Sequence, residues 1–397
     1  MWLALLARDS NALRRASFCP QAGLEHTGGE LTLGVLQMTN AWMILIAVGT
    51  VALTAEVTQA VEKGPVEIRT VAKSADPDYY AFPSVCRLAN GDLLCVFYCG
   101  TGHISPNGKI VMVRSKDEGK TWSKPEVILD TAWDDRDPSI MQTRSGRMLV
   151  NSFDYDGVNR SRNGDKKPQV FVTISDDGGK TFGKPKPIDV GWPFDATSDA
   201  ICELRDGTLL LPLYGRKTGD TKDRAAVAFS KDGGLTWNKT DPVTIAYDEA
   251  DKIDFQEPAL VLLPDGTVRC SLRTTNVGYH AYESRSTDGG KTWSKPIDTG
   301  LRGHAACLLH HSSGVIFQAY RSWTEDGKMR GVAAVFAEPD KPWDPKKEFP
   351  IMLVGGDCAY PSAVELSDHS IFCVFYAREH RAIEAAVISP ESIKALR

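Results

Sequence analysis

An eight-residue motif recurs four times, and no other feature restricts the possible folds of this chain so strongly. The copies start at Ser115, Ser175, Ser230 and Ser286 and read SKDEGKTW, SDDGGKTF, SKDGGLTW and STDGGKTW. Asp accepts hydrogen bonds from turn amides, Gly supplies a positive φ, and the final aromatic ring can pack against a sheet. We interpret each copy as a structural hairpin turn, with AEPDKPW, ending at Trp343, as a worn fifth copy. A calcium loop is the alternative interpretation.

A second repeat alternates with the first and consists of a strand, a turn and another strand. Its six copies start at Ala81, Arg136, Thr197, Gln256, His304 and Ala359, and most are followed by a further strand and the eight-residue turn. Four short strands in roughly 50 to 60 residues are typical of one propeller blade. The sequence therefore predicts an all-β fold, a six-bladed β-propeller over residues 61–397. A strand from Pro65 to Ala72 would complete the last blade and close the ring.

The composition excludes one class of partner and assigns no site to the cysteines. With 24% charged residues, a net charge of −5 and no long basic run, the chain lacks the charge pattern of a nucleic-acid-binding protein. Cys95, Cys270 and Cys373 occupy the same position after the turn in different units, too far apart to be bridged. No CxxC or Cys/His zinc pattern occurs, so we expect buried free thiols, no metal site and no cofactor.

The first sixty residues differ from the rest of the chain. An apolar run from Ala41 to Ala55 is too short to span a bilayer comfortably, which takes about 20 residues, and suits the h-region of a signal peptide. Met38 lies just before this run, so residues 38–60 are predicted to be a signal peptide and residues 1–37 an extension created by start-site choice. We expect a secreted or periplasmic protein with no membrane span in the mature chain. A buried or membrane-anchoring helix is the alternative.

Reactive side chains occur at matching positions in the second repeat, just before its Pro-like position. These positions hold Tyr80-Ala81-Phe82, Asp135-Arg136-Asp137, Thr197-Ser198, Gln256-Glu257, His304-Ala305 and Ala359-Tyr360. The innermost strands of a propeller line its central channel, so these residues should converge at one mouth. A core strand has no structural need for Arg136, Asp137, Glu257 or Tyr360. We interpret their convergence as a functional site, with buried salt bridges between blades as the alternative.

The eight-residue motifs resemble the Asp boxes, or BNR repeats, of the sialidase superfamily. Together with a six-bladed propeller, they extend this resemblance over about residues 65–390. The resemblance implies a tyrosine nucleophile assisted by a glutamate, an aspartate acid/base and three arginines that bind the substrate carboxylate. By their place in the repeats, it implies Tyr360 as nucleophile, Glu257 as its base, and Arg273 and Arg330 as two of the arginines. At the same mouth we take Asp137 as a further catalytic candidate, and Arg136 and His304 as candidates for substrate binding.

Two departures from the family's pattern affect this expected site. The first arginine of the family lies in a Phe-Arg-Ile-Pro motif, which here reads Tyr80-Ala81-Phe82-Pro83. The acid/base loop reads GTGHISPNGK and contains no Asp, so His103 is the side chain there with a suitable pKa. Arg136 and Asp137, on the second unit, are candidates to replace the missing arginine and carboxylate.

The sequence leaves three functions open. The first is an exo-acting glycoside hydrolase that removes terminal sialic acid or a related acidic sugar, where a neutral phenol avoids charge repulsion with the substrate carboxylate. The second is a glycosidase of another mechanism, with Asp137 and Glu257 as a carboxylate pair. The third is a non-catalytic glycan-binding propeller. Each predicts a glycan or a small acidic sugar as partner, and the fold alone cannot choose between them.

Overall fold

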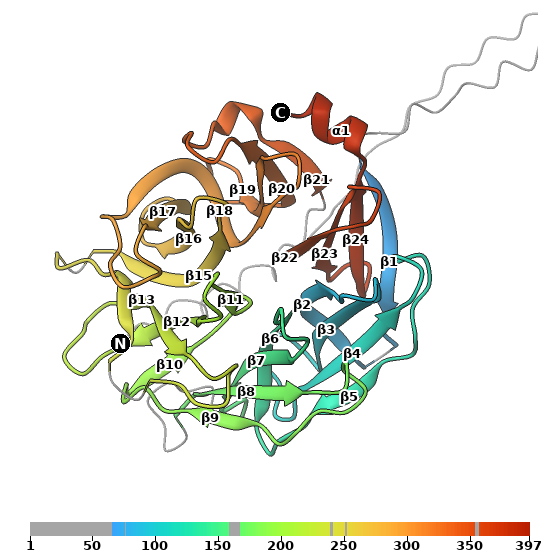
Figure 1. The fold of residues 1–397 in the computed structure, drawn as a ribbon, viewed down its shortest axis with the longest axis horizontal. Helices are drawn as coiled ribbons and strands as arrows, with labels where there is room; N and C mark the ends of the chain where they lie inside the picture. The colour runs from blue at the N-terminus through green and yellow to red at the C-terminus, as the bar shows by residue number, and fades with distance from the viewer. Residues whose placement is uncertain (1–65, 76, 159–166, 239–240, 251, 354–356) are drawn as a thin grey trace, which may run out of the picture. The chain divides into compact units, whose positions relative to one another are not determined.

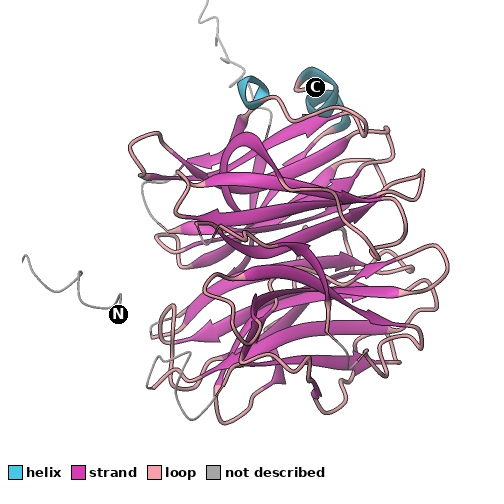
Figure 2. Cartoon of the chain, turned by 90° about the vertical axis from the view of Figure 1, so that its left-hand side faces the viewer, coloured by secondary structure: helices cyan, strands magenta, loops and turns pink. Residues whose placement is uncertain are grey.

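The computed structural model describes residues 66–75, 77–158, 167–238, 241–250, 252–353 and 357–397. The predicted signal peptide and the extension before it lie outside these residues. The described chain is built from antiparallel strands, with one short 3-10 helix (Pro345–Lys347) and one short α-helix, α1 (Pro390–Ala395). Figure 2 shows this dominance of strands. The all-β prediction is confirmed. Among the described residues, no helix is long and apolar enough to cross a membrane.

The first two sheets each contain four strands that follow one another along the chain. The first sheet is ordered β2 (Tyr79–Arg87), β3 (Leu93–Gly100), β4 (Lys109–Ser115) and β5 (Glu126–Leu129). The second is ordered β6 (Asp134–Gln142), β7 (Met148–Tyr155), β8 (Gln169–Ser175) and β9 (Lys186–Ile188). In both sheets the strand that begins the predicted unit lies nearest the centre of the ring of sheets (Figure 1).

The third sheet is interrupted on its inner side. It is ordered β10 (Phe194–Ala196), β12 (Leu209–Arg216), β13 (Arg224–Ser230) and β14 (Val243–Ala246), and the short strand β11 (Cys202–Glu203) also pairs with β12. The inner strand is thus split into β10 and β11, with Thr197, Ser198 and Asp199 between them. This unit has Asp199 where most other units have proline, and it keeps the same place in the ring (Figure 1).

The next two repeat units form one continuous sheet of seven strands. Its order is β15 (Asp254–Leu262), β16 (Val268–Thr275), β17 (His280–Ser286), β18 (Ile297–His310), β19 (Ile316–Trp323), β20 (Met329–Ala337) and β21 (Phe349–Leu353). The 14-residue strand β18 pairs with β17 through its first half and with β19 through its second half. The described chain therefore has five sheets, because β18 runs unbroken from the outer edge of one unit to the inner edge of the next.

The last sheet joins the two ends of the described chain. Its order is β1 (Glu67–Lys73), β24 (Ala382–Ile388), β23 (Ile371–Ala377) and β22 (Cys358–Glu365). Glu67 pairs with Val387 and Lys73 with Ala382, in antiparallel register. This confirms that the segment before the first unit supplies the outer strand of the last one. Pairing of β1 leaves the edge of β24 covered, which protects its backbone amides and carbonyls.

The hydrophobic core lies between neighbouring sheets. Phe97 of β3 and Phe372 and Tyr376 of β23, for example, are fully buried in one cluster that joins the first and last sheets. Strand β2 also packs against β6 and β22, and β15 packs against β12 and β18. Each sheet is thus held by its two neighbours, and this fixes the relative position of the inner strands that carry the candidate site. All eight cysteines of the described part of the chain are free, as predicted, and all but the half-buried Cys202 are buried.

The eight-residue motifs form the predicted hairpin turns. In each, the Thr hydroxyl donates a hydrogen bond of 2.5–2.7 Å to the Asp carboxylate. In each, the Ser hydroxyl accepts a bond of 2.8–2.9 Å from the second glycine-position amide. Hydrogen bonds from the hydroxyl and amide of Thr121 and from the Ser115 hydroxyl lower the pKa of Asp117 to about 2. The terminal rings of Trp122, Trp237 and Trp293 pack on the core, so the motif is structural, as expected.

Candidate functional site

A repeated backbone distortion aims the candidate side chains. In five of the units the inner strand has a register shift, and the residue in the shift has a positive φ of 45–52°. These residues are Phe82, Asp137, Glu257, Ala305 and Tyr360. A bulge of this kind turns a side chain away from the regular alternation of the strand, and a non-glycine residue with positive φ is strained and needs support from its surroundings. The distortion places Asp137, Glu257 and Tyr360 at equivalent points of three different sheets.

Tyr360, Glu257 and Arg273 form one hydrogen-bonded group. The Tyr360 hydroxyl donates to Glu257 Oε1 at 2.8 Å, and Arg273 Nη1 donates to the same oxygen at 2.5 Å. Burial and the carboxylates of Glu257 and Asp137 raise the pKa of Tyr360 well above its ordinary value, so the phenol is protonated. The structure thus brings together the predicted nucleophile and its base, with the predicted second arginine on the same carboxylate.

Asp137 and Arg136 reach the same place from β6. Arg136 is buried, donates to Asp134 Oδ2 at 3.1 Å and lies 3.8 Å from Asp137 Oδ1. Its guanidinium also lies over the Phe82 ring, 5.1 Å from the centroid. Burial raises the pKa of Asp137 to about 7, against the opposite effect of Arg136. Both residues of the second unit therefore sit beside the Tyr360–Glu257 pair, where the sequence predicted them.

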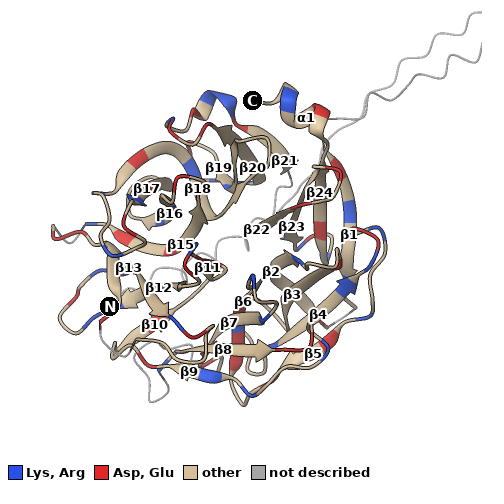
Figure 3. Cartoon of the chain, in the orientation of Figure 1, with Lys and Arg blue, Asp and Glu red and all other residues tan. Residues whose placement is uncertain are grey.

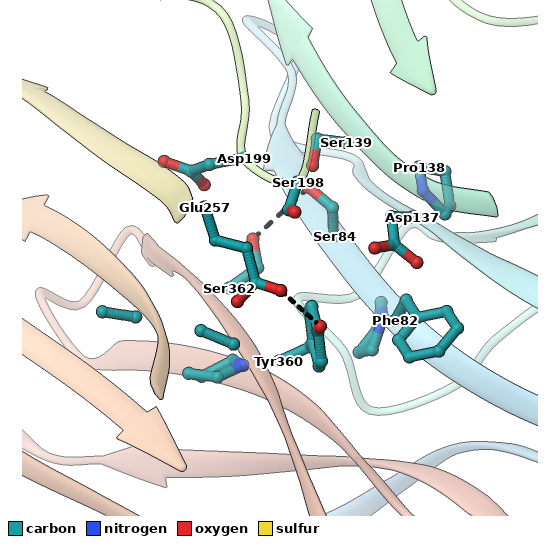
Figure 4. Close-up of a pocket in the computed structure, with 14 residues that line it drawn as sticks. Phe82, Ser84, Asp137, Pro138, Ser139, Ser198, Asp199, Glu257, Tyr360 and Ser362 are labelled. Atoms are coloured by element: carbon teal, nitrogen blue, oxygen red, sulfur yellow. Dashed lines mark hydrogen bonds between the residues drawn. The ribbon is translucent and has the colours of Figure 1, made fainter. Parts of the chain in front are cut away.

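Three cavities meet at this group. The axial cavity, shown in Figure 4, lies around Glu257, Tyr360, Asp137 and the serines of the inner strands. The central cavity, of about 210 Å³, adds Arg136, Arg273 and His103 and has an aromatic wall of Phe153, Tyr155, Phe194 and Tyr214. The side cavity, of about 520 Å³, is lined by Arg273, Thr275, Asn276, Gly278, Tyr279, His304, Arg321 and Trp323. None of the four Asp-box aspartates of the described chain lines any of these cavities.

His304 and Arg321 belong to the side cavity. Burial and the guanidiniums of Arg273 and Arg321 lower the pKa of His304 to about 3, so its ring is neutral. The rings of Tyr279 and Trp323 stack beside it, with centroids 4.4 Å apart and planes within 13°. Arg321 donates to Asp357 at 2.8 Å and to the Tyr376 hydroxyl at 2.7 Å. The side cavity therefore combines two guanidiniums with an aromatic wall.

Arg330 lies outside the three cavities. Its Nη1 donates to Glu348 Oε1 at 2.9 Å, and its side chain lines none of the three cavities. The expectation that Arg330 points at the same volume as Arg273 therefore does not agree with the structure. The physical reason is the position along the hairpin: Arg330 begins β20, on the far side of a turn, whereas Arg321 lies near the end of β19.

Comparison with known proteins agrees with this architecture. A family model described as a BNR repeat-like domain matches residues 91–373. The chain belongs to the BNR repeat family of the sialidase superfamily.

Two curated sialidases are similar to this BNR repeat protein. The sialidase of Bacteroides fragilis (strain YCH46) is 28% identical over 214 residues, which are 50% of this chain and 37% of the sialidase. The sialidase of Micromonospora viridifaciens is 28% identical over 240 residues, which are 54% of this chain and 36% of that protein. The matched part of the BNR repeat protein thus spans little more than a third of the length of either sialidase.

Solved structures show the same fold. A Dyadobacter fermentans protein of unknown function is 26% identical, with a TM-score of 0.68 over 81% of this chain and 98% of that one. The Hadza microbial sialidase Hz136 is 19% identical, with a TM-score of 0.65 over 79% of this chain and 66% of that one. The Trypanosoma rangeli sialidase, solved in complex with sialic acid, is 14% identical, with a TM-score of 0.59 over 83% of this chain and 60% of that one.

Sequence reasoning missed Arg321, although the repeat of the BNR chain contained the signal. The aligned segments QEPALVLLPDGTVRCSLR and HAACLLHHSSGVIFQAYR both end in arginine, at Arg273 and Arg321. Both residues occupy the sixth position of the second strand of their unit, in β16 and β19. In the other units this column holds Tyr98, Phe153, Tyr214 and Tyr376. The column therefore supplies two of the arginines of the site and two rings, Phe153 and Tyr214, of the central cavity.

The arginines of the site all have carboxylate partners. Each of Arg136, Arg273 and Arg321 is paired with a carboxylate, from Asp134, Glu257 and Asp357 respectively. Basic and acidic residues are interspersed over the loops and outer strands (Figure 3). The guanidiniums are held in place by charge-assisted bonds, which fixes their geometry before any ligand binds.

Proposed function

We propose that this protein is an exo-acting, sialidase-like glycoside hydrolase that removes terminal sialic acid or a related acidic sugar through Tyr360 and Glu257. The observation that carries the proposal is the 2.8 Å hydrogen bond from the Tyr360 hydroxyl to Glu257 Oε1. A phenol whose pKa is raised by burial needs a base to become a nucleophile, and Glu257 is positioned to take its proton. The similarity to two curated sialidases supports the class of reaction.

The arginines support an acidic substrate. Arg273 and Arg321 line the side cavity together, and Arg273 also lines the central cavity beside Tyr360. Arg136 extends into the central cavity from β6, on the side where the family's first arginine is missing. A planar guanidinium binds a carboxylate through two parallel hydrogen bonds. We therefore assign substrate binding to Arg136, Arg273 and Arg321.

The number of propeller blades and the localisation of the protein are part of the proposal. We infer six blades, with the seven-stranded sheet counted as two blades that share β18, because six copies of the strand–turn–strand repeat are present. We also propose export through a signal peptide within residues 38–60, from the apolar run after Met38. The proposed substrate is a glycan or a small acidic sugar outside the cell.

Trapping of a covalent intermediate tests the mechanism. The purified protein would first be incubated with a panel of aryl glycosides, including a sialoside. For each sugar that is hydrolysed, the incubation would then be repeated with a fluorinated analogue that slows breakdown of the intermediate. We expect hydrolysis of an acidic sugar and a mass increase on the peptide that contains Tyr360. Hydrolysis with the label on a carboxylate instead would favour a carboxylate-pair glycosidase. Hydrolysis without any labelled residue would refute the covalent mechanism.

A non-catalytic glycan-binding protein is the second candidate, and the side cavity supports it. The stacked rings of Tyr279 and Trp323 offer an aromatic surface beside hydrogen-bonding side chains, which is the usual composition of a ligand pocket. Tyr279 is 38% exposed although it is a large ring. If the wild-type protein binds glycans on an array, hydrolyses none of them, and loses binding in Tyr279→Ala, this candidate replaces the hydrolase.

A further inference from the structure

The loop between β3 and β4 does not supply a proton donor for the proposed reaction. It contributes His103 and Ile104 to the central cavity and contains no Asp or Glu. Burial and the neighbouring guanidinium of Arg136 lower the pKa of His103 to about 4, so its ring is neutral at neutral pH and a poor acid. A group that protonates a leaving-group oxygen must therefore come from another element.

Asp137 is the carboxyl group that the structure offers. The bulge of β6 holds it at φ 47° and aims it into the axial and central cavities, which also contain Glu257 and Tyr360. Figure 4 shows its carboxyl group facing the space occupied by these two side chains. Its side chain is buried, and among the described residues Oδ1 has no hydrogen-bond partner; Arg136 Nη2 is 3.8 Å away. A buried carboxyl oxygen without a partner is costly unless a ligand or a proton satisfies it.

The charges around Asp137 leave it close to half protonated at neutral pH. Asp134 and Arg136 face it from its own strand, Glu257 from β15 and Arg273 from β16. Burial and the two carboxylates raise its pKa, the two guanidiniums lower it, and the result is about 7. The protonated phenol of Tyr360, from β22, and the neutral ring of His103 line the same central cavity. A group that titrates near the working pH can both give and take a proton.

We propose that Asp137 is the acid/base catalyst of this protein, contributed by the second repeat unit in place of the carboxyl group missing from the loop between β3 and β4. The inference rests on the proposed hydrolysis through Tyr360. In the first step the Tyr360 oxygen bonds to the anomeric carbon and gives its proton to Glu257, while Asp137 protonates the departing glycosidic oxygen. In the second step Asp137 takes a proton from water, the water oxygen bonds to the anomeric carbon, and Tyr360 leaves and recovers its proton from Glu257.

Asp199 provides a matched control. It is a half-buried carboxyl in the lining of the axial cavity, and desolvation there raises its pKa to about 7 as well. However, its Oδ2 accepts a hydrogen bond from the Leu260 amide at 3.1 Å, and its carboxyl group points away from Glu257 and Tyr360 (Figure 4). The two residues therefore have similarly raised pKa values and differ in hydrogen bonding and in orientation toward the reacting group.

A leaving-group series distinguishes an acid catalyst from a structural carboxyl. We would measure kcat/KM of wild type, Asp137→Asn and Asp199→Asn with dinitrophenyl, phenyl and methyl sialosides, or the same glycosides of whichever sugar the wild type hydrolyses. Asn tolerates positive φ, so the bulge of β6 should persist. Asp137→Asn should lose about 10²–10⁴-fold with methyl glycosides and little with dinitrophenyl ones, which need no acid. Asp199→Asn should keep the leaving-group dependence of the wild type.

Two further readouts complete the test. Azide, which attacks without a base, should speed the turnover of dinitrophenyl glycosides by Asp137→Asn alone and form a glycosyl azide. The wild-type kcat/KM for phenyl glycosides should fall above about pH 7, where Asp137 loses its proton, and this limb should be absent in Asp137→Asn. An equal loss for all leaving groups in Asp137→Asn would overturn the assignment.

Direct titration separates this inference from the proposed function. The protonated carboxyl band in the infrared difference spectrum of wild type and Asp137→Asn should disappear with a midpoint near pH 7. A wild type that hydrolyses no glycoside would refute the proposed function, whatever the titration shows. An Asp137 that is fully ionised at pH 5 would overturn the acid/base role, even in an active enzyme.

Discussion

Replacement of Glu257 by Gln tests the central group of the site most directly. Glu257 Oε1 accepts one hydrogen bond from the Tyr360 hydroxyl and one from Arg273 Nη1. The Gln side chain has nearly the same shape and keeps one oxygen acceptor, so substrate contacts in the cavity should change little. It cannot take a proton from the phenol, however. We therefore expect kcat to fall while KM stays within a few-fold of the wild type.

The size of the loss follows from the role of the lost group. General base assistance is typically worth about 10²–10⁴-fold, which corresponds to roughly 3–5 kcal/mol of transition-state stabilisation. Tyr360→Phe removes the nucleophile itself and should cost at least as much. Because the phenol and the carboxylate act as a unit, the double variant should be no worse than Tyr360→Phe alone.

The assay is steady-state kinetics of the wild type, Glu257→Gln, Tyr360→Phe and the double variant with the aryl glycoside that the wild type hydrolyses. A double-mutant cycle gives the coupling free energy, which should be about as large as the effect of Glu257→Gln itself. Glycan binding by Tyr360→Phe, measured by calorimetry, shows that the site remains folded. Multiplicative effects of the two substitutions, or full activity of Tyr360→Phe, would refute a nucleophile and base that act together.

Three further predictions concern other parts of the chain. Arg321→Ala should raise KM for an acidic sugar about 10–100-fold, as expected for loss of a hydrogen bond to a charged group, while Arg330→Ala should change KM less than about threefold. A larger effect of Arg330→Ala than of Arg321→Ala would contradict substrate binding by Arg321. Ser115→Ala removes the hydrogen-bond acceptor of the Gly119 amide and should lower the free energy of unfolding, measured by urea titration, by about 1–2 kcal/mol. An unchanged unfolding midpoint would contradict a structural turn. N-terminal sequencing of exported protein should begin between about Ala52 and Glu62, and retention of residues 1–37 would disprove the signal peptide.

Repeats made much of this protein predictable from its sequence. The Asp boxes, the strand–turn–strand units and the closing strand depend on local turn chemistry and on a period along the chain. These patterns can be read from the sequence without knowledge of tertiary contacts. The repeat count therefore predicted that β1 completes the last unit, although β1 and β24 lie over 300 positions apart. The positions of Glu257 and Tyr360 followed from the same period, since equivalent residues of each unit must face the same axis.

Other features were decided only by the packing of neighbouring sheets. The length of β18 depends on an unbroken run between two units, which continues through Gly300 although this residue has a positive φ of 74°. The exclusion of Arg330 from the cavities depends on which end of the hairpin reaches them. The bulges that aim Asp137, Glu257 and Tyr360 are backbone distortions whose strain only the assembled inner strands can hold.

The sequence by itself determined the all-β class of fold, the repeat unit and the equivalent positions of Asp137, Glu257 and Tyr360 in that unit. The tertiary structure alone decided that Arg273 shares Glu257 Oε1 with Tyr360, that Asp137 Oδ1 has no hydrogen-bond partner among the described residues, and which pKa values are shifted. The physical reason is the range of the interactions. Turn geometry and strand periodicity act over a few residues, whereas the charges that shift the pKa of Asp137 come from three different strands, β6, β15 and β16.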